Sequence, residues 1–263
     1  MTARLRDGAP RDGADTGRLQ AGEVRAMFDR IAGVYDLLNG AMTAGLHHRW
    51  RARAVDLACV SPGSRVLDVA TGTGDLALEL ARRVAPGGEV VGADFAEGML
   101  DRARAKAERH PGAVRPRFEW ADATALPYPD DSFDAATVGF GVRNFEDLPR
   151  GLAEMARVVR PGGTLASLEF MLPPQPGWRA AWWLYTRLAL PLAGGLTGGP
   201  AWYRVGRFLG PSISTHYRRY SLDDHIAAWH AAGLTDVGTG LMSLGGGLIM
   251  WGRKAAPPAG PGS

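Results

Sequence analysis

Cysteine is almost absent from this sequence, because Cys59 is the single cysteine among 263 residues. One thiol excludes an internal disulfide framework and any zinc or iron–sulfur site built from several cysteines, and we expect no metal site. Long hydrophobic runs are lacking as well. The most apolar stretch, 178–210, is interrupted by Arg187, Pro191 and several glycines. It contains no span of about 20 apolar residues, so no transmembrane helix is predicted.

Charge of one sign is not in large excess either. Lys and Arg number 30 against 27 Asp and Glu, and no long basic run occurs, which argues against a nucleic-acid partner. The N-terminal segment has no apolar stretch typical of a signal peptide, and the low cysteine content fits a cytoplasmic location. Residues 1–22 and 255–263 are rich in glycine, proline or charge and are expected to be disordered tails.

Between these tails the sequence alternates between strand and helix patterns, which predicts an open, mostly parallel α/β sheet in one domain, 23–254. The segments expected as strands are 66–70, 89–94, 117–120, 133–140 and 164–170, and those expected as helices are 76–84, 96–109 and 148–159. The turn Pro161-Gly162-Gly163 is expected to end the last of these helices. Strands 236–242 and 248–254 should close the sheet as an antiparallel hairpin, after a helix over 221–232 capped by Ser221.

Two segments do not fit this alternation. Residues 23–58 are expected to be helical, with a second helix over 47–57, and they form an N-terminal helical cap. Residues 173–220 are expected to form an inserted cap. Ligands of open α/β sheets bind at the carboxyl ends of the strands, so the ligand site is expected at that edge, with the inserted cap on the side of the acceptor.

A glycine-containing turn follows the first expected strand. The segment Val66–Asp75 (VLDVATGTGD) runs from a strand through Gly72 and Gly74 into a helix. Glycine permits positive φ angles that let a backbone approach a ligand closely, and the helix start offers unpaired N–H groups. Asp94 ends the second strand, where a carboxylate can accept hydrogen bonds from both hydroxyls of a ribose, and Phe95 follows it. These residues are predicted to bind a cofactor.

Further carboxylates stand near this turn. Asp122 and Ala123 follow the third strand, where an aspartate can bind an adenine amino group. Asp68 lies within the first strand, and Asp75 lies at the start of the helix. Negative charge therefore stands where a diphosphate would have to bind.

Two cofactors match this pattern. The spacing of Gly72, Gly74 and Ala77 agrees formally with a dinucleotide fingerprint. S-adenosyl-L-methionine carries a sulfonium and an ammonium group, and it suits the carboxylates Asp68 and Asp75 better. An NAD-dependent oxidoreductase and a non-catalytic cofactor-binding protein remain as alternatives to a methyltransferase.

Five segments resemble one known family. They are Met27–Asn39 (MFDRIAGVYDLLN), Gly45–Arg51 (GLHHRWR), Val66–Ala77 (VLDVATGTGDLA), Phe140–Gly163 (FGVRNFEDLPRGLAEMARVVRPGG) and Leu168–Phe170 (LEF). Together they closely resemble the ubiquinone/menaquinone biosynthesis C-methyltransferases. The resemblance implies the class I S-adenosylmethionine-dependent methyltransferase fold, Rossmann-like, with a mostly parallel seven-stranded sheet and a C-terminal antiparallel hairpin strand.

The resemblance also implies a reaction. The family methylates a ring carbon of a prenylated quinol and leaves S-adenosyl-L-homocysteine, so demethylmenaquinol would become menaquinol in the last step of menaquinone biosynthesis. The C-terminal third departs from the family pattern. Another aromatic or natural-product acceptor is therefore the alternative, and a benzoquinol is not distinguished from a naphthoquinol.

Carried over by position, the family's cofactor contacts fall on Thr73, Asp94, Asp122, Ala123 and Gly139. The last of these is usually serine in the family, so a hydroxyl is lost in this chain.

Three residues are assigned to catalysis. Arg143 is expected to stabilise a developing phenolate, Asn144 to orient the ring or a water molecule, and Asp75 to position the reacting end of the cofactor. The alternative for Arg143 is a surface ion pair with Glu146 or Asp147. The proton acceptor is left open between water and a histidine such as His47 or His48.

The inserted cap can be interpreted in two ways. Its apolar residues are expected to line a groove for a prenyl tail: Trp178, Trp182, Trp183, Leu184, Leu188, Leu190 and Leu192. Its arginines would then meet lipid phosphates in a peripheral contact at the inner face of the membrane: Arg179, Arg187, Arg204 and Arg207. The other reading is an amphipathic helix packed on the domain. A homodimer is left open.

Overall fold

The computed structural model describes residues 22, 26, 29, 40, 43 and 45–256. Side chains at 190, 193, 194, 196–202, 204–206, 208 and 209 are also left undescribed. Apart from residues 22, 255 and 256, the expected tails lie outside the described residues. So does most of the segment 23–44, including nearly all of the expected helix around Met27–Asn39.

A seven-stranded sheet forms the centre of the molecule, in the order β3-β2-β1-β4-β5-β7-β6. The five strands from β3 to β5 are parallel, and β7 runs antiparallel to both of its neighbours. The strands are β1 Arg65–Val69, β2 Glu89–Asp94, β3 Arg117–Trp120, β4 Phe133–Gly139, β5 Val159–Phe170, β6 Leu234–Met242 and β7 Gly247–Lys254. This topology confirms the predicted fold class.

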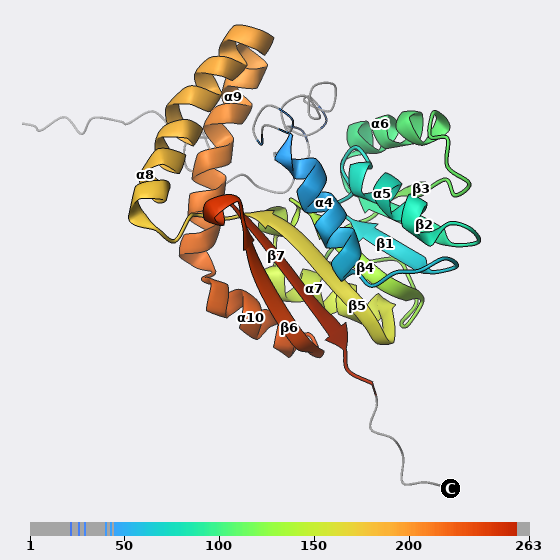
Figure 1. The fold of residues 1–263 in the computed structure, drawn as a ribbon. Helices are drawn as coiled ribbons and strands as arrows, with labels where there is room; N and C mark the ends of the chain where they lie inside the picture. Colours follow the sequence, from blue (N-terminus) through green and yellow to red (C-terminus); the bar gives the residue numbers. More distant parts are fainter. Residues whose placement is uncertain are drawn as a thin grey trace, which may run out of the picture.

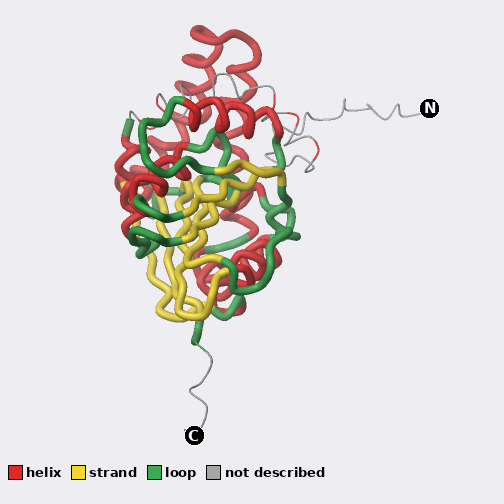
Figure 2. The backbone as a smooth tube through the Cα atoms, turned by 90° about the vertical axis from the view of Figure 1, so that its right-hand side faces the viewer, coloured by secondary structure: helices red, strands yellow, loops and turns green. Residues whose placement is uncertain are grey.

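Helices cover both faces of the sheet (Figures 1 and 2). On one face lie α4 (Leu46–Leu57), α5 (Asp75–Val84) and α6 (Glu97–Glu108), and on the other lie α7 (Leu148–Val158) and α10 (Leu222–Ala231). Neighbouring residues of one strand supply the two cores, because successive side chains of a strand point to opposite faces. In β1, Val66 belongs to the first core and Leu67 to the second, and both are fully buried.

The prediction for 159–170 was wrong in one respect. The Pro161-Gly162-Gly163 turn does not separate a helix from a strand, because α7 ends at Val158 and β5 begins directly at Val159. The register with β4 shifts there, from Phe133↔Val159 to Ala135↔Thr164. The extra residues form a bulge, in which Gly162 takes φ 78°. A proline is tolerated at such an irregular strand start.

The inserted cap is helical from Pro176 to Arg219. It consists of α8 (Pro176–Leu184), a π-helical stretch η2 (Tyr185–Ala189) and α9 (Leu190–Arg219). A Cβ atom on Gly210 would lie 2.9 Å from Thr186 Oγ1, although 24 helical residues would span about 36 Å if straight. The chain therefore doubles back within α9, and the two limbs project side by side beyond the sheet (Figure 1).

Helix α4 is attached to the far end of the chain. Trp50 Nε1 donates a hydrogen bond of 3.1 Å to Ser243 Oγ, in the turn between β6 and β7. Its indole also packs against Phe140 and Phe170, with ring centroids 6.3 and 6.1 Å apart, respectively. This contact holds α4 over the carboxyl ends of β4 and β5.

Candidate active site

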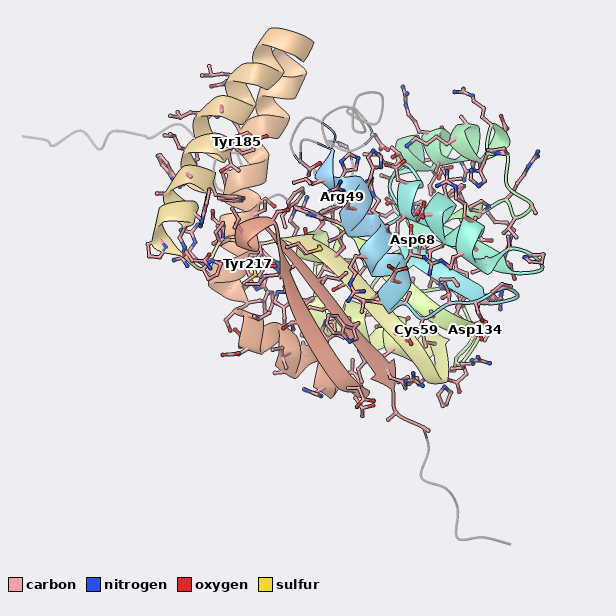
Figure 3. All side chains as sticks on the ribbon, viewed as in Figure 1. Arg49, Cys59, Asp68, Asp134, Tyr185 and Tyr217 are labelled. Carbon is pink, nitrogen blue, oxygen red and sulfur yellow. The ribbon has the colours of Figure 1, made fainter. Side chains whose placement is uncertain are left out.

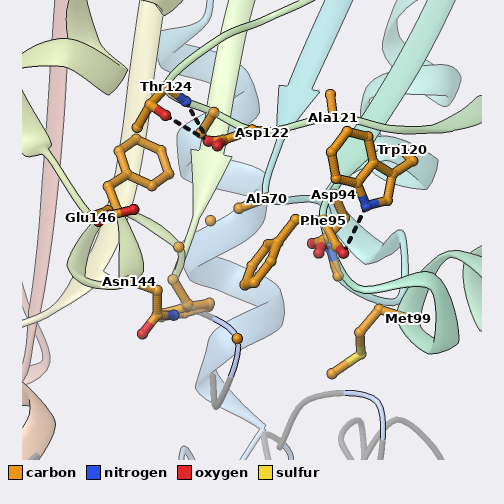
Figure 4. A pocket seen from close by; sticks show the side chains of 17 residues that line it. Ala70, Asp94, Phe95, Met99, Trp120, Ala121, Asp122, Thr124, Asn144 and Glu146 are labelled. Carbon is orange, nitrogen blue, oxygen red and sulfur yellow. Dashed lines mark hydrogen bonds between the residues drawn. The ribbon is translucent and has the colours of Figure 1, made fainter. Parts of the chain in front are cut away.

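A pocket of about 260 Å³ opens at the carboxyl ends of β1, β2, β3 and β4, which is the edge predicted from the topology (Figure 4). A second, smaller hollow adjoins it and shares Ala70, Gly72, Gly139 and Phe140 with it. The two hollows are therefore the two ends of one groove that passes over the glycine turn.

Asp94 anchors the turn to the second strand. Its carboxylate accepts hydrogen bonds from the backbone N–H of Gly72 at 2.8 Å and of Ala96 at 2.9 Å. Burial raises the pKa of Asp94 to about 6, against the lowering effect of these N–H groups. Each oxygen keeps a lone pair, so the carboxylate can still accept bonds from a ligand in the pocket that it lines.

Asp68 lies at the other end of the groove and is fully buried. Its two oxygens accept hydrogen bonds from the hydroxyls of Thr71 at 2.6 Å and Thr137 at 2.8 Å. Burial raises the pKa of Asp68 to about 6, although these hydroxyls and the charge of Arg51 lower it. A buried carboxylate next to a small hollow is suited to a cationic ligand group.

The third strand supplies the outer wall of the larger pocket. Asp122 Oδ1 accepts bonds from the N–H and the hydroxyl of Thr124, each 2.8 Å long. Trp120 Nε1 donates to the carbonyl of Phe95 at 3.0 Å, as Figure 4 shows. The predicted residues Phe95, Asp122 and Ala123 all line this pocket.

The glycine turn requires glycine at Gly74. Its φ is 83°, and a Cβ atom there would lie 2.8 Å from Phe118 Cζ and 3.0 Å from Ala103 Cβ. Both strain and collision oppose any side chain. The turn therefore keeps helix α5 close to the sheet, with its N-terminus facing the smaller hollow.

Asp75, the first residue of α5, is held by two cations. Lys106 Nζ lies 2.6 Å from Oδ1 and Arg51 Nη1 lies 3.0 Å from Oδ2. Burial favours a higher pKa for Asp75, but the charges of Arg51 and Lys106 outweigh it and lower the pKa. Asp75 is thus an ionised partner of these cations at the edge of the smaller hollow.

Arg143 forms a buried ion pair and not the surface ion pair that was its alternative interpretation. Its Nη1 donates to Glu169 Oε1 and, at 2.8 Å, to the carbonyl of Phe140. Both charged side chains are about 95% buried, so the ion pair is internal and involves neither Glu146 nor Asp147. Arg143 Nε is buried and has no hydrogen-bond partner among the described residues.

Asn144 and Gly139 line the larger pocket, so the structure brings Asn144 next to the cofactor residues. Arg143 lines neither hollow. His47 is buried and its Nδ1 lies 2.7 Å from Thr43 Oγ1, whereas His48 is exposed. The expected apolar lining of the cap is largely turned outward, with Trp178, Trp183, Leu184, Leu188 and Leu192 between 50 and 60% exposed.

Three polar features were missed by the sequence analysis. Arg51 and Lys106 converge on Asp75, and Glu169 neutralises Arg143. A buried pair, His216 of α9 and His225 of α10, has its Nε2 atoms 2.9 Å apart. Arg51 and Glu169 belong to segments that carry the family resemblance, and this was the one available signal for their importance.

The chain matches a known protein family over most of its length. The sequence profile described as "ubiE/COQ5 methyltransferase family" matches residues 16–254. The chain belongs to this family. Among its relatives, "Demethylmenaquinone methyltransferase" of Thermus thermophilus is 53% identical over 71% of this chain and 83% of its own length. A protein of the same name from Desulfitobacterium hafniense is 37% identical over 91% of this chain and 92% of its own length.

As a member of the ubiE/COQ5 methyltransferase family, the chain is an S-adenosylmethionine-dependent methyltransferase, as its sequence predicted. Solved structures agree on the fold. A "SAM dependent methyltransferase from Aquifex aeolicus" is 18% identical, has a TM-score of 0.55, and covers 78% of this chain and 89% of its own. Phosphoethanolamine N-methyltransferase 2 of Haemonchus contortus, solved with S-adenosyl-L-methionine, is 14% identical with a TM-score of 0.60, over 86% and 57% of the two chains. Within the described residues, no helix is long and apolar enough to cross a membrane.

Proposed function

We propose that this methyltransferase transfers a methyl group from S-adenosyl-L-methionine to a ring carbon of a prenylated quinol, converting demethylmenaquinol to menaquinol. The relatives from Thermus and Desulfitobacterium, both named for demethylmenaquinone methylation, support this substrate. The observation that carries the proposal is the single groove that has Asp94 at one end, Asp68 at the other and Asn144 beside it.

The residues of the groove fit the cofactor. Asp94 and Asp122 offer carboxylate oxygens in the larger pocket, where a ribose and an adenine would be held. The smaller hollow holds the buried carboxylate of Asp68, which matches an ammonium group, and a buried Arg51 Nη1 without a hydrogen-bond partner among the described residues. When bound, S-adenosyl-L-methionine supplies an electrophilic methyl group on a sulfonium.

The residues between these two ends then set the reaction geometry. Gly139 and Phe140 line both hollows, so the reacting centre lies near them. Asn144, on the same side, orients the acceptor ring. Arg143 lines neither hollow, so it acts on the phenolate by its charge from the turn that follows Phe140, while Glu169 fixes the guanidinium. Bound S-adenosyl-L-methionine would supply the methyl group to the ring carbon, and the hydrogen displaced from that carbon would leave as a proton.

Methyl transfer with two acceptors tests the proposal. Chain and S-adenosyl-L-methionine are incubated with demethylmenaquinol or with a demethylated ubiquinol precursor, and products are weighed by mass spectrometry. We expect a gain of one methylene mass on the naphthoquinol and formation of S-adenosyl-L-homocysteine. Arg143→Ala should lower turnover by a factor of about 10² to 10³ with unchanged binding of S-adenosyl-L-homocysteine. Methylation of neither quinol, in a chain that binds the cofactor, would favour another aromatic acceptor.

We propose in addition that the projecting helices α8 and α9 contact the inner face of a membrane, where a prenylated quinol resides. Residues 176–219 contain six arginines and no acidic residue. Exposed apolar side chains stand beside exposed arginines, as where Arg187 lies over the ring of Trp183 at 5.8 Å. Arginine with exposed tryptophan and leucine is a composition that favours anionic interfaces.

Vesicle co-sedimentation tests this contact. With vesicles rich in anionic phospholipid, Trp183→Glu/Leu188→Glu should lose most of the binding of the unmodified chain. Leu241→Glu serves as the control, because Leu241 is a leucine of β6 that is 50% exposed, like Leu188. Equal binding by the double variant would remove the membrane proposal. If light scattering instead shows a dimer that the double variant abolishes, the same surface is a homodimer interface.

A further inference from the structure

The residues that line the groove determine the orientation of a ligand bound in it. The larger pocket contains the residues suited to adenosine, Asp94 and Asp122, and the smaller hollow contains Asp68, Asp75 and Arg51. Because the two hollows share Gly72, a ligand that fills the larger one with its adenosine extends its amino-acid end into the smaller one. That end is a zwitterion with one ammonium and one carboxylate.

Arg51 is the cation that reaches into the smaller hollow from helix α4. Its side chain is 9% exposed, and its Nη1 makes no hydrogen bond among the described residues. The contact of Nη1 with Asp75 is an ion pair of 3.0 Å without hydrogen-bond geometry. Arg51 also lies 5.9 Å from the centre of the Phe140 ring, which belongs to both hollows.

Arg51 has no carboxylate to itself among the described residues. Asp75 is shared with Lys106, whose Nζ lies closer, at 2.6 Å, and makes a hydrogen bond to the carboxylate. A buried guanidinium is stable only when it is paired and hydrogen-bonded. A ligand carboxylate would supply both, because a guanidinium binds a carboxylate with two parallel N–H···O bonds.

We propose that Arg51 is the receptor for the α-carboxylate of the cofactor, with Asp68 facing the ammonium group of the same ligand. This inference rests on the proposed use of S-adenosyl-L-methionine and adds a binding residue from outside the glycine turn. It also gives α4 a function, because the helix delivers Arg51 over the groove. Figure 3 labels Asp68 next to this helix in that view.

The test compares two ligands that differ at this end alone. S-adenosyl-L-homocysteine carries the amino-acid part, and 5′-methylthioadenosine carries the same adenosine and thioether without it. Affinities are measured by calorimetry for the unmodified chain, Arg51→Gln, Arg51→Lys and Arg53→Gln. Arg53 lies on the same helix and is exposed, so it is the matched control.

We expect Arg51→Gln to weaken S-adenosyl-L-homocysteine by about 10- to 100-fold, the range for one charged hydrogen-bonded contact, and 5′-methylthioadenosine by less than twofold. The affinity of Arg51→Lys for S-adenosyl-L-homocysteine should lie between those of the unmodified chain and Arg51→Gln. Arg53→Gln should bind both ligands normally. Retained binding of 5′-methylthioadenosine shows that the variant is folded.

Equal losses for both ligands, or no loss for either, would overturn the role of Arg51 while leaving the proposed function intact. A failure of the unmodified chain to bind S-adenosyl-L-homocysteine would overturn the proposed function, and this inference with it.

Discussion

Two buried arginines flank the groove, and the structure treats them in opposite ways. Arg51 shares the partly exposed Asp75 with Lys106, whereas Arg143 has the buried Glu169 to itself. Each leaves one nitrogen without a hydrogen-bond partner among the described residues. Glu169 accepts further bonds from the backbone N–H of Arg143 and of Phe170. Arg51 can therefore exchange its ion-pair partner for a ligand, whereas Arg143 stays paired with Glu169.

The difference shows what holds each guanidinium in position. A guanidinium with a private, fully hydrogen-bonded carboxylate is part of the folded framework, so its position is set before any ligand arrives. A guanidinium with a shared and partly solvated partner depends more on what enters the hollow. This contrast predicts a structural penalty on the Arg143 side and a ligand-dependent one on the Arg51 side.

The largest expected effect is on stability, and it comes from removing Glu169, the carboxylate that pairs with Arg143 alone. Glu169→Ala leaves the guanidinium of Arg143 buried and unpaired, which should lower the free energy of unfolding by about 3–5 kcal/mol. Urea denaturation followed by circular dichroism measures it. Glu169→Gln keeps the shape and the acceptor oxygen and should lose less. A loss below about 1 kcal/mol for the alanine variant would show that the pair does not stabilise the fold.

The next effect concerns pH on the cofactor side. Burial raises the pKa of both Asp68 and Asp94 to about 6, and both must be ionised to hold an ammonium group and ribose hydroxyls. Each group then costs up to tenfold in affinity per pH unit below its pKa, so binding of S-adenosyl-L-homocysteine should weaken by about 100-fold from pH 7.5 to pH 5. Calorimetry across this range checks it, and Asp94→Asn should flatten the profile.

Stability without ligand should change in the opposite direction. A carboxyl whose pKa is raised in the folded chain binds more protons there than in the unfolded chain between about pH 4 and pH 6. The contribution of Asp68 and Asp94 to the stability of the unliganded chain therefore falls as pH rises through this window.

For the affinity prediction, a ligand affinity that stays constant between pH 7.5 and pH 5 would contradict the assignment of these carboxylates to the cofactor.

The smallest effect should come from the shared partner. Asp75→Asn removes a carboxylate that is 24% exposed and leaves Lys106, which is 27% exposed, and Arg51, whose buried guanidinium lines the smaller hollow. Water can enter that hollow, so the loss of stability should be about 1 kcal/mol. Because the two cations lower the pKa of Asp75, its stabilisation is present above the unfolded pKa and is lost as pH falls below it. Thermal unfolding at pH 7 and pH 3 measures both. A penalty as large as that of Glu169→Ala would abolish the contrast between the two arginines.

Much of the fold could be predicted from the sequence because local rules determine it. Short apolar segments bounded by glycine turns gave β1, β2, β3 and β4 to within about one residue, and Ser221 with Asp224 forms the capping box that begins α10. The bulge at Pro161 could not be predicted in this way, since it depends on the register between β4 and β5, which turn residues alone do not encode.

The candidate site divides along the same line. The placement of Asp68, Asp94 and Asp122 along one groove could be predicted, because the strand ends of a parallel sheet meet at one edge. The partners of Asp75 and Arg143 were not found, because Lys106 and Glu169 lie 31 and 26 residues away and reach them through packing. The outward direction of Trp183 and Leu188 was also hidden, since an apolar residue on a helix does not reveal whether protein or lipid will cover it.

The hydrogen bond between Trp50 and Ser243 joins positions 193 residues apart. A chain emerging from the ribosome can form the parallel strands early, but α4 finds its final packing partner only when the β6–β7 turn has been synthesised. Arg51 follows Trp50 directly, so its placement over the groove depends in part on this contact. The C-terminal hairpin, which lines neither hollow, therefore contributes to the site through the helix that it holds in place.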